Sequence, residues 1–122
     1  MVKALLGQIA AESGDDPKLA GLAGDCLDVT DWMLTTASLD DKLAASVAFQ
    51  RMCAVAVAGW QLMRQARAAQ RDGAPGTIAA TKPLVARYFH DHIVPEASGL
   101  KGSAMMGASL LYDLDAGVLT GA

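Results

Sequence analysis

The chain has 122 residues and a net charge of −3, and 52% of its residues are hydrophobic although only 5% are aromatic. This length fits one domain with a hydrophobic core of its own. The ten Lys and Arg residues form no basic block, which excludes the electrostatic footprint of a nucleic-acid binder. The apolar residues are mostly Ala, Leu, Val and Met, and this composition favours helices over strands.

The N-terminal segment lacks the basic region, apolar run and small-residue cleavage site of a secretory signal. Cys26 and Cys53 each lie in an apolar, helix-like setting, where a free thiol packs as a small hydrophobe. We therefore expect a cytoplasmic protein with reduced cysteines.

Residues 2–12 predict a short first helix. A second helix is predicted over 17–37, with Asp16 as its N-cap and Pro17 at its first position. Its apolar residues follow helical spacing up to Trp32 and Met33. The break at 13–17 and the junction at 38–41 separate these helices from each other and from the next one.

Residues 40–71 predict a third, long helix. Asp40 and Asp41 at its start and Arg71 at its end suit the helix dipole. The stretch from Met52 to Met63 is apolar nearly all round, so we expect this helix to be central and buried on several sides. The polar Gln50 and charged Arg51 lie in the middle of the apolar region, which favours a core helix over a membrane span.

A fourth helix is predicted over 82–94, with a start as early as Thr77. Pro83 would either lie in the first turn of a helix capped by Thr81 or kink a longer helix. A fifth helix is predicted over 96–116, with an inner stripe that extends just past its end: Leu100, Ala104, Gly107, Leu111, Leu114 and Val118. The prediction is an all-α, antiparallel bundle of four main helices plus the short N-terminal helix, in a single domain over residues 1–122.

Two polar clusters are candidate binding sites. His90 and His92 are two apart and point about 200° away from each other on a helix, so we expect one solvated and one packed histidine rather than a metal site. The row Asp25, Asp28 and Asp31 predicts a solvated or ion-paired face.

Arg51 is expected to be buried and paired with an Asp of the second helix, since an unpaired buried charge is costly; contact with a phosphate or carboxylate is the alternative. Methionines such as Met52 and Met105 are expected to fill the core rather than line a ligand pocket. No catalytic, cofactor-binding or metal-binding residue is predicted in this segment. The candidate packing or interface anchors are Trp32, Arg51, Trp60, Met63, Tyr88 and Phe89.

The string AVAVAGWQLMRQARAA, followed after a loop by ATKPLVARYFHDHIVPEASGL, resembles the C-terminal helical domain of the long acyl-CoA dehydrogenases. Pro83 departs from the family pattern, which has a helix former or aliphatic residue there. The opening helices and Gly107 fit the family's layout, and the residues that carry the match are Gly59, Trp60, Arg64, Ala68, Ala80, Lys82, Ala86, Arg87, Tyr88, Phe89, His92, Val94 and Pro95.

The resemblance implies a parent flavoprotein of fatty acid metabolism that oxidises an acyl-CoA to the 2,3-enoyl-CoA with FAD. In that family the catalytic Glu, the flavin site and the CoA channel lie upstream, so this segment is expected to hold no cofactor and to do no catalysis. Its expected partner is the catalytic domain of the parent chain or a second subunit. The alternative is a free-standing helical module that binds an apolar ligand or a protein. Membrane attachment is not expected, because the acidic balance is opposite to that of membrane-surface helices.

Overall fold

The computed structural model describes residues 1–71 and 76–121, where the chain forms helices and turns and no strand. The prediction of an all-helical fold is confirmed. The elements are α1 (Val2–Glu12), α2 (Pro17–Thr35), α3 (Leu39–Arg71), α4 (Gly76–Tyr88), the π-helix η1 (Phe89–Ile93), α5 (Val94–Ser98), α6 (Lys101–Ala104), α7 (Ser109–Tyr112) and α8 (Ala116–Thr120).

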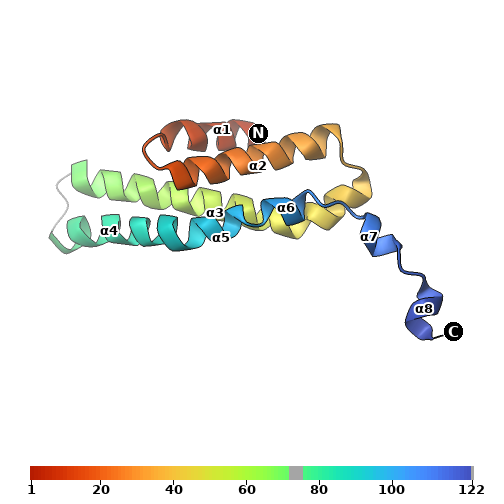
Figure 1. Ribbon diagram of the computed structural model, residues 1–122. Coiled ribbons are helices and arrows are strands. Elements are labelled where there is room, and N and C mark those ends of the chain that lie inside the picture. Colours follow the sequence, from red (N-terminus) through yellow and green to blue (C-terminus); the bar gives the residue numbers. More distant parts are fainter. Residues whose placement is uncertain (72–75, 122) are drawn as a thin grey trace.

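The long helices lie side by side, and each reverses the direction of the one before it (Figure 1). Helix α3 contacts α1, α2, α4, η1, α5 and α6, which makes it the central element as predicted. Helices α7 and α8 project away from the other helices (Figure 1).

The hydrophobic core lies between α1, α2, α3 and the segment from α5 to α6. Helix α2 contributes Leu19, Leu22, Cys26 and Val29, all fully buried. Helix α3 contributes residues spaced by three or four positions, as expected for one helical face: Met52, Ala56, Trp60 and Met63.

The opposite face of α3 is open, so the prediction of burial on several sides is wrong for this face. Val47 is 77% exposed, and Ala54 and Ala58 are also exposed. By length and composition alone α3 could cross a membrane, but these are also the properties of a core helix, and 28% of its most apolar stretch is buried.

The first helices begin where the sequence predicts. Helix α1 has the predicted bounds, and α2 ends two residues earlier than expected. The N-cap role of Asp16 is confirmed, because its Oδ1 accepts a hydrogen bond of 3.2 Å from the backbone N–H of Leu19.

Helices α4, η1 and α5 form one continuous rod. Helix α4 begins at Gly76 and holds Pro83 well inside it, so the alternative of a helix capped by Thr81 is wrong. The rod widens into a π turn just before Pro95, and the N–H of Val94 bonds to the carbonyl of Phe89. A proline clashes with the carbonyl four residues earlier in an α-helix, and the wider turn moves that carbonyl aside.

The single helix predicted over 96–116 is wrong. The chain there forms only α5, α6, α7 and the start of α8, separated by turns. Gly107 has φ of +83°, a left-handed conformation that ends regular helix and favours glycine. Of the predicted inner stripe, Ala104 is buried, but Leu111, Leu114 and Val118 are between 52% and 69% exposed.

Asp41 ties the C-terminal segment to the start of α3. Its Oδ2 accepts from the N–H of Ser38, whose hydroxyl in turn accepts from the N–H of Asp41. The Oδ1 of Asp41 accepts a 2.9 Å hydrogen bond from the N–H of Ala108. The bond from Ala108, followed by those from Ser38, lowers the pKa of Asp41 below its ordinary value.

Acid should therefore release the Ala108 anchor. Because the folded pKa of Asp41 is lowered, its contribution is complete above the ordinary aspartate pKa and is lost only as the pH falls through the lower, folded value. We expect the amide of Ala108 to lose protection from hydrogen exchange over that acid range. Asp41→Ala, which removes the acceptor, should lack this protection at neutral pH, and an Ala108 amide equally protected in both proteins would contradict the assignment.

Candidate functional site

A cleft of about 400 Å³ lies between the N-terminus of α2, the C-terminal third of α3 and the rod of α4 and η1. It combines a buried histidine with several charged groups. Its lining residues are Asp15, Asp16, Pro17, Lys18, Met63, Ala66, Pro83, Ala86, Arg87, His90 and Asp91.

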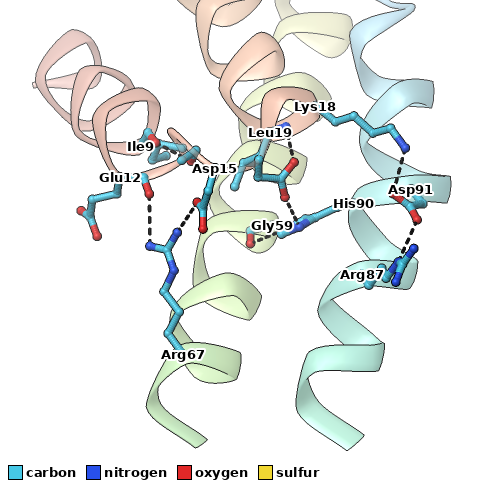
Figure 2. Close-up of polar contacts among 12 residues, drawn as sticks. Ile9, Glu12, Asp15, Lys18, Leu19, Gly59, Arg67, Arg87, His90 and Asp91 are labelled. Carbon is cyan, nitrogen blue, oxygen red and sulfur yellow. Dashed lines mark hydrogen bonds and ion pairs between the residues drawn. The ribbon is translucent and has the colours of Figure 1, made fainter. Parts of the chain in front are cut away.

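His90 joins three elements at the base of this cleft. It lies on η1 and is 7% exposed. Its Nε2 lies 2.9 Å from the carbonyl oxygen of Gly59 on α3, and its Nδ1 pairs with the carboxylate of Asp16 (Figure 2). Because a carbonyl oxygen only accepts, Nε2 carries a proton and donates it. Asp16 thus serves both as the N-cap of α2 and as the partner of His90.

The arrangement of His90 favours a structural role over proton transfer. A general base needs a nitrogen free to reach the proton it removes. Here both ring nitrogens face protein acceptors, and the part of the cleft lining that the structure describes includes no serine, threonine or cysteine that could act as a nucleophile. The histidine fixes the start of α2 against α3 and η1.

Gly59 allows these elements to approach closely. A Cβ at this position would lie 3.0 Å from Leu19 Cδ1, 3.4 Å from Phe89 Cε1 and 3.5 Å from His90 Cδ2. Leu19 is fully buried and cannot move aside without disturbing the core. The lack of space for a Cβ explains why a glycine precedes Trp60 in the Gly-Trp pair noted in the sequence.

Gly59→Ala should destabilise the chain although alanine is the better helix former. Alanine stabilises a helix by about 1 kcal/mol relative to glycine, whereas overpacking of the core costs about 1–3 kcal/mol. The matched control is Gly21→Ala, at an exposed position inside α2 where a Cβ meets nothing within 4 Å. The free energy of unfolding of the control, measured with urea, should rise by about 0.5–1 kcal/mol. Equal stability of the two variants would rule out the packing role of Gly59.

Ion pairs surround the rim of the cleft (Figure 2). Arg67 donates to the carbonyl of Glu12 at 3.1 Å and to the carboxylate of Asp15 at 2.6 Å, which fixes the turn between α1 and α2 to α3. Asp91 accepts from Lys18 at 2.8 Å and lies 3.7 Å from Arg87, and the hydrogen bond from Lys18 lowers its pKa. These charges are paired within the chain and are not directed at an empty site.

The two histidines behave as predicted. His90 is packed, while His92 is exposed and stacks on Tyr88 with ring centroids 4.5 Å apart. Among residues 1–71 and 76–121, no group of three or more His, Cys, Asp and Glu residues could hold a metal ion.

The aspartate row on α2 is ion-paired, which confirms one of the predicted alternatives. Asp25 and Asp28 lie 3.4 Å and 2.7 Å from the Nζ of Lys101, and Asp31 lies 2.7 Å from the Nζ of Lys3. The hydrogen bond to Asp28 raises the pKa of Lys101. These pairs fix α6 and α1 against α2.

The prediction of a buried Arg51 is wrong. Its side chain is 64% exposed and pairs at 3.2 Å with Glu96, not with an Asp of α2. The next residue, Met52, faces the core, and consecutive helical side chains point about 100° apart. The helix phase therefore turns Arg51 outward, where its ion pair contributes about 1 kcal/mol or less.

The other predicted anchors divide between core and surface. Trp60 and Met63 are 7% and 6% exposed and belong to the core, although Met63 also lines the cleft. Phe89 is half-buried against the core, Trp32 is half-buried on α2, and Tyr88 is 63% exposed. Of the six anchors, only Tyr88 and Arg51 are mostly exposed to solvent.

The cleft does not fit the flavin that the family resemblance implies for the parent. A flavin dinucleotide carries an anionic pyrophosphate, which proteins bind with free backbone N–H groups at a helix N-terminus. Here the N-terminus of α2 carries Asp15 and Asp16, and Asp16 already accepts the N–H of Leu19. Pro17, at the first position of α2, has no N–H, and Asp16 takes the N–H of Leu19, so this helix end lacks two of the backbone donors that would hold a pyrophosphate.

The fold and the site define an all-helical domain whose described polar groups mainly hold its helices together. Residues 5–115 match the family described as acetyl-CoA dehydrogenase C-terminal like. The chain belongs to this family and is a C-terminal accessory domain of acyl-CoA dehydrogenase-like proteins, which confirms the resemblance found in the sequence. Comparisons with curated proteins and with solved structures gave no match.

Proposed function

We propose that this domain packs against the catalytic body, or against a second subunit, of an FAD-dependent acyl-CoA dehydrogenase and carries out no chemistry itself. The parent would oxidise an acyl-CoA to the 2,3-enoyl-CoA in the cytoplasm, with the flavin bound by the catalytic body. The single domain would span residues 1–122. The poor fit of the cleft to a pyrophosphate supports a flavin site outside this chain.

The observation that carries the proposal is the large amount of exposed apolar surface. Leu39, Leu43 and Val47 form a stripe at four-residue spacing along the start of α3 and are between 62% and 77% exposed. A second group lies on the projecting segment that contains α7 and α8: Leu110, Leu111, Leu114, Val118 and Leu119. Apolar side chains gathered in this way mark protein–protein contact surfaces more often than free surface.

Association with the catalytic body tests the proposal. The purified chain and the separately expressed catalytic body should form a complex in analytical ultracentrifugation. The double variant L39Q/L43Q should weaken this complex at least tenfold, which corresponds to about 1.4 kcal/mol. The matched control is K3Q, because Lys3 is an exposed ion-pair residue on α1 and lies outside the stripe.

Two results would contradict the proposal. A chain purified alone with bound flavin, or with dehydrogenase activity, would place chemistry in this segment. A complex as stable with L39Q/L43Q as with the unaltered chain would remove the stripe from the interface.

The alternative, an apolar-ligand module, is favoured by one surface groove. A groove of about 410 Å³ between α1, α2 and α3 is almost entirely apolar and is lined by Met1, Val2, Lys3, Thr30, Met33, Leu34 and Phe49. This groove is not lined by Met52, Met63 or Met105: the first two are buried in the core cluster and Met105 packs against it, as predicted for core filler. Native mass spectrometry that shows a retained fatty acyl group would favour this alternative, and a ligand-free chain would count against it.

A further inference from the structure

The C-terminal segment leaves the other helices instead of packing on them. Residues 109–120, which contain α7 and α8 and are here called the arm, project away from the rest of the chain (Figure 1). No residue of α7 or α8 is buried. The Leu and Val side chains of the arm are between 52% and 71% exposed: Leu110, Leu111, Leu114, Val118 and Leu119. The arm therefore presents apolar side chains that no described part of the same chain covers.

The arm begins next to the exposed stripe of α3 (Leu39, Leu43 and Val47). Its first residue follows Ala108, whose N–H donates to Asp41 at 2.9 Å. Asp41 lies in the first turn of α3, within the stretch that carries the stripe. This hydrogen bond holds the root of the arm beside the stripe, while the arm itself extends away from the helices (Figure 1). The arm therefore does not cover the stripe of its own chain.

We propose that the arm of one copy packs on the stripe of a second copy, and that the second copy returns the same contact. The inference rests on the proposed function, because it names a second copy of this chain as the subunit that covers the stripe. Since the root of the arm lies beside the stripe, a two-fold axis near that point brings each arm to the stripe of the other copy. The exchange is closed, because two copies cover both surfaces and leave neither for a third.

The exposed apolar area is sufficient for a stable dimer. A fully exposed Leu or Val side chain presents roughly 100 Å² of apolar surface. The eight side chains of the arm and the stripe are between 52% and 77% exposed, so each copy offers roughly 500 Å² and a pair roughly 1,000 Å². A standard interface buries about 1,200–2,000 Å², of which somewhat more than half is apolar. The exchange therefore reaches the apolar area of a standard interface.

Sedimentation of the purified chain tests the proposal. Analytical ultracentrifugation should show a dimer that dissociates on dilution. The stripe variant L39Q/L43Q and the arm variant L114Q/V118Q should each weaken the dimer by about tenfold or more. Both variants should keep the helical circular dichroism of the unaltered chain, because all four side chains are exposed. The matched control is L84Q, at an exposed leucine of α4 outside both surfaces, and it should dimerise like the unaltered chain.

A mixture of the two variants distinguishes exchange between copies from any other association. The intact arm of the stripe variant can pack on the intact stripe of the arm variant. The heterodimer therefore keeps one of the two contacts, whereas a dimer of either variant alone keeps none. With one variant fluorescently labelled, the heterodimer should be tighter than either homodimer by about tenfold or more.

Three results would overturn the arm exchange. They are a chain that stays monomeric up to millimolar concentration, a dimer that L39Q/L43Q or L114Q/V118Q leaves unchanged, and a mixture no tighter than either variant alone. A monomeric chain that binds the catalytic body through the stripe overturns only the exchange and leaves the proposed function standing. A dimer that forms by exchange but binds no catalytic body supports the exchange and counts against docking on that body.

Discussion

Replacing Trp60 with alanine should lower the free energy of unfolding by about 3–5 kcal/mol, the range observed when a large buried aromatic is truncated. Trp60 is 7% exposed, belongs to the core cluster and lies beside Gly59, where α2, α3 and η1 come closest. The guanidinium of Arg64 also lies 4.9 Å from the centre of its ring. Urea unfolding followed by circular dichroism measures the loss.

Trp60→Phe is the matched control. The Nε1 of Trp60 is buried and has no hydrogen-bond partner among the described residues, so the indole N–H is desolvated without compensation. Phenylalanine keeps most of the ring contacts and removes that N–H. We expect this variant to lose less than about 1.5 kcal/mol. If Trp60→Ala cost less than about 1 kcal/mol, Trp60 would belong to an interface and not to the core.

Local signals in the sequence are sufficient to predict where the first three helices begin and end to within about two residues. Pro17 at the first position and Asp16 as a cap fix the start of α2 through backbone chemistry within a few residues. Such signals do not depend on the rest of the fold. The same is true of the aspartate row on α2, since charged groups on an exposed face find ion partners wherever the neighbouring helices supply them.

The errors arose where tertiary packing decides the outcome. The apolar residues Leu111, Leu114 and Val118 have nearly helical spacing, but periodicity alone does not provide a surface on which to pack. The left-handed Gly107 interrupts the segment before they can join the core. The apolar neighbours of Arg51 in the sequence predict burial, whereas its environment depends on the phase of α3 relative to α2.

The link between Asp16 and His90 could not be found from spacing at all. Each residue carries a local signal, one as a helix cap and the other as a histidine in an apolar helix. Their contact depends on how α2 and η1 pack on α3, and on the absence of a side chain at Gly59. Single-sequence patterns do not contain that information.

Removing the imidazole of His90 should cost about 2–3 kcal/mol, because two polar partners lose their donor at once. The carbonyl of Gly59 would be left without its 2.9 Å donor in a buried place, and the carboxylate of Asp16 would keep only the N–H of Leu19. We propose His90→Ala for the measurement and His92→Ala as its control. His92 is exposed and stacks on Tyr88, and its replacement should cost no more than about 0.5 kcal/mol.

A double-mutant cycle with Asp16→Asn separates the His90 link from general damage to the cleft. If the two groups interact as the structure shows, the double variant should lose less stability than the sum of the single variants, with a coupling of about 1 kcal/mol or more. Strict additivity would mean that Asp16 acts only as the cap of α2. In that case His90 would fix η1 to α3 through Gly59 alone, and the start of α2 would be held by Arg67 and the turn after α1.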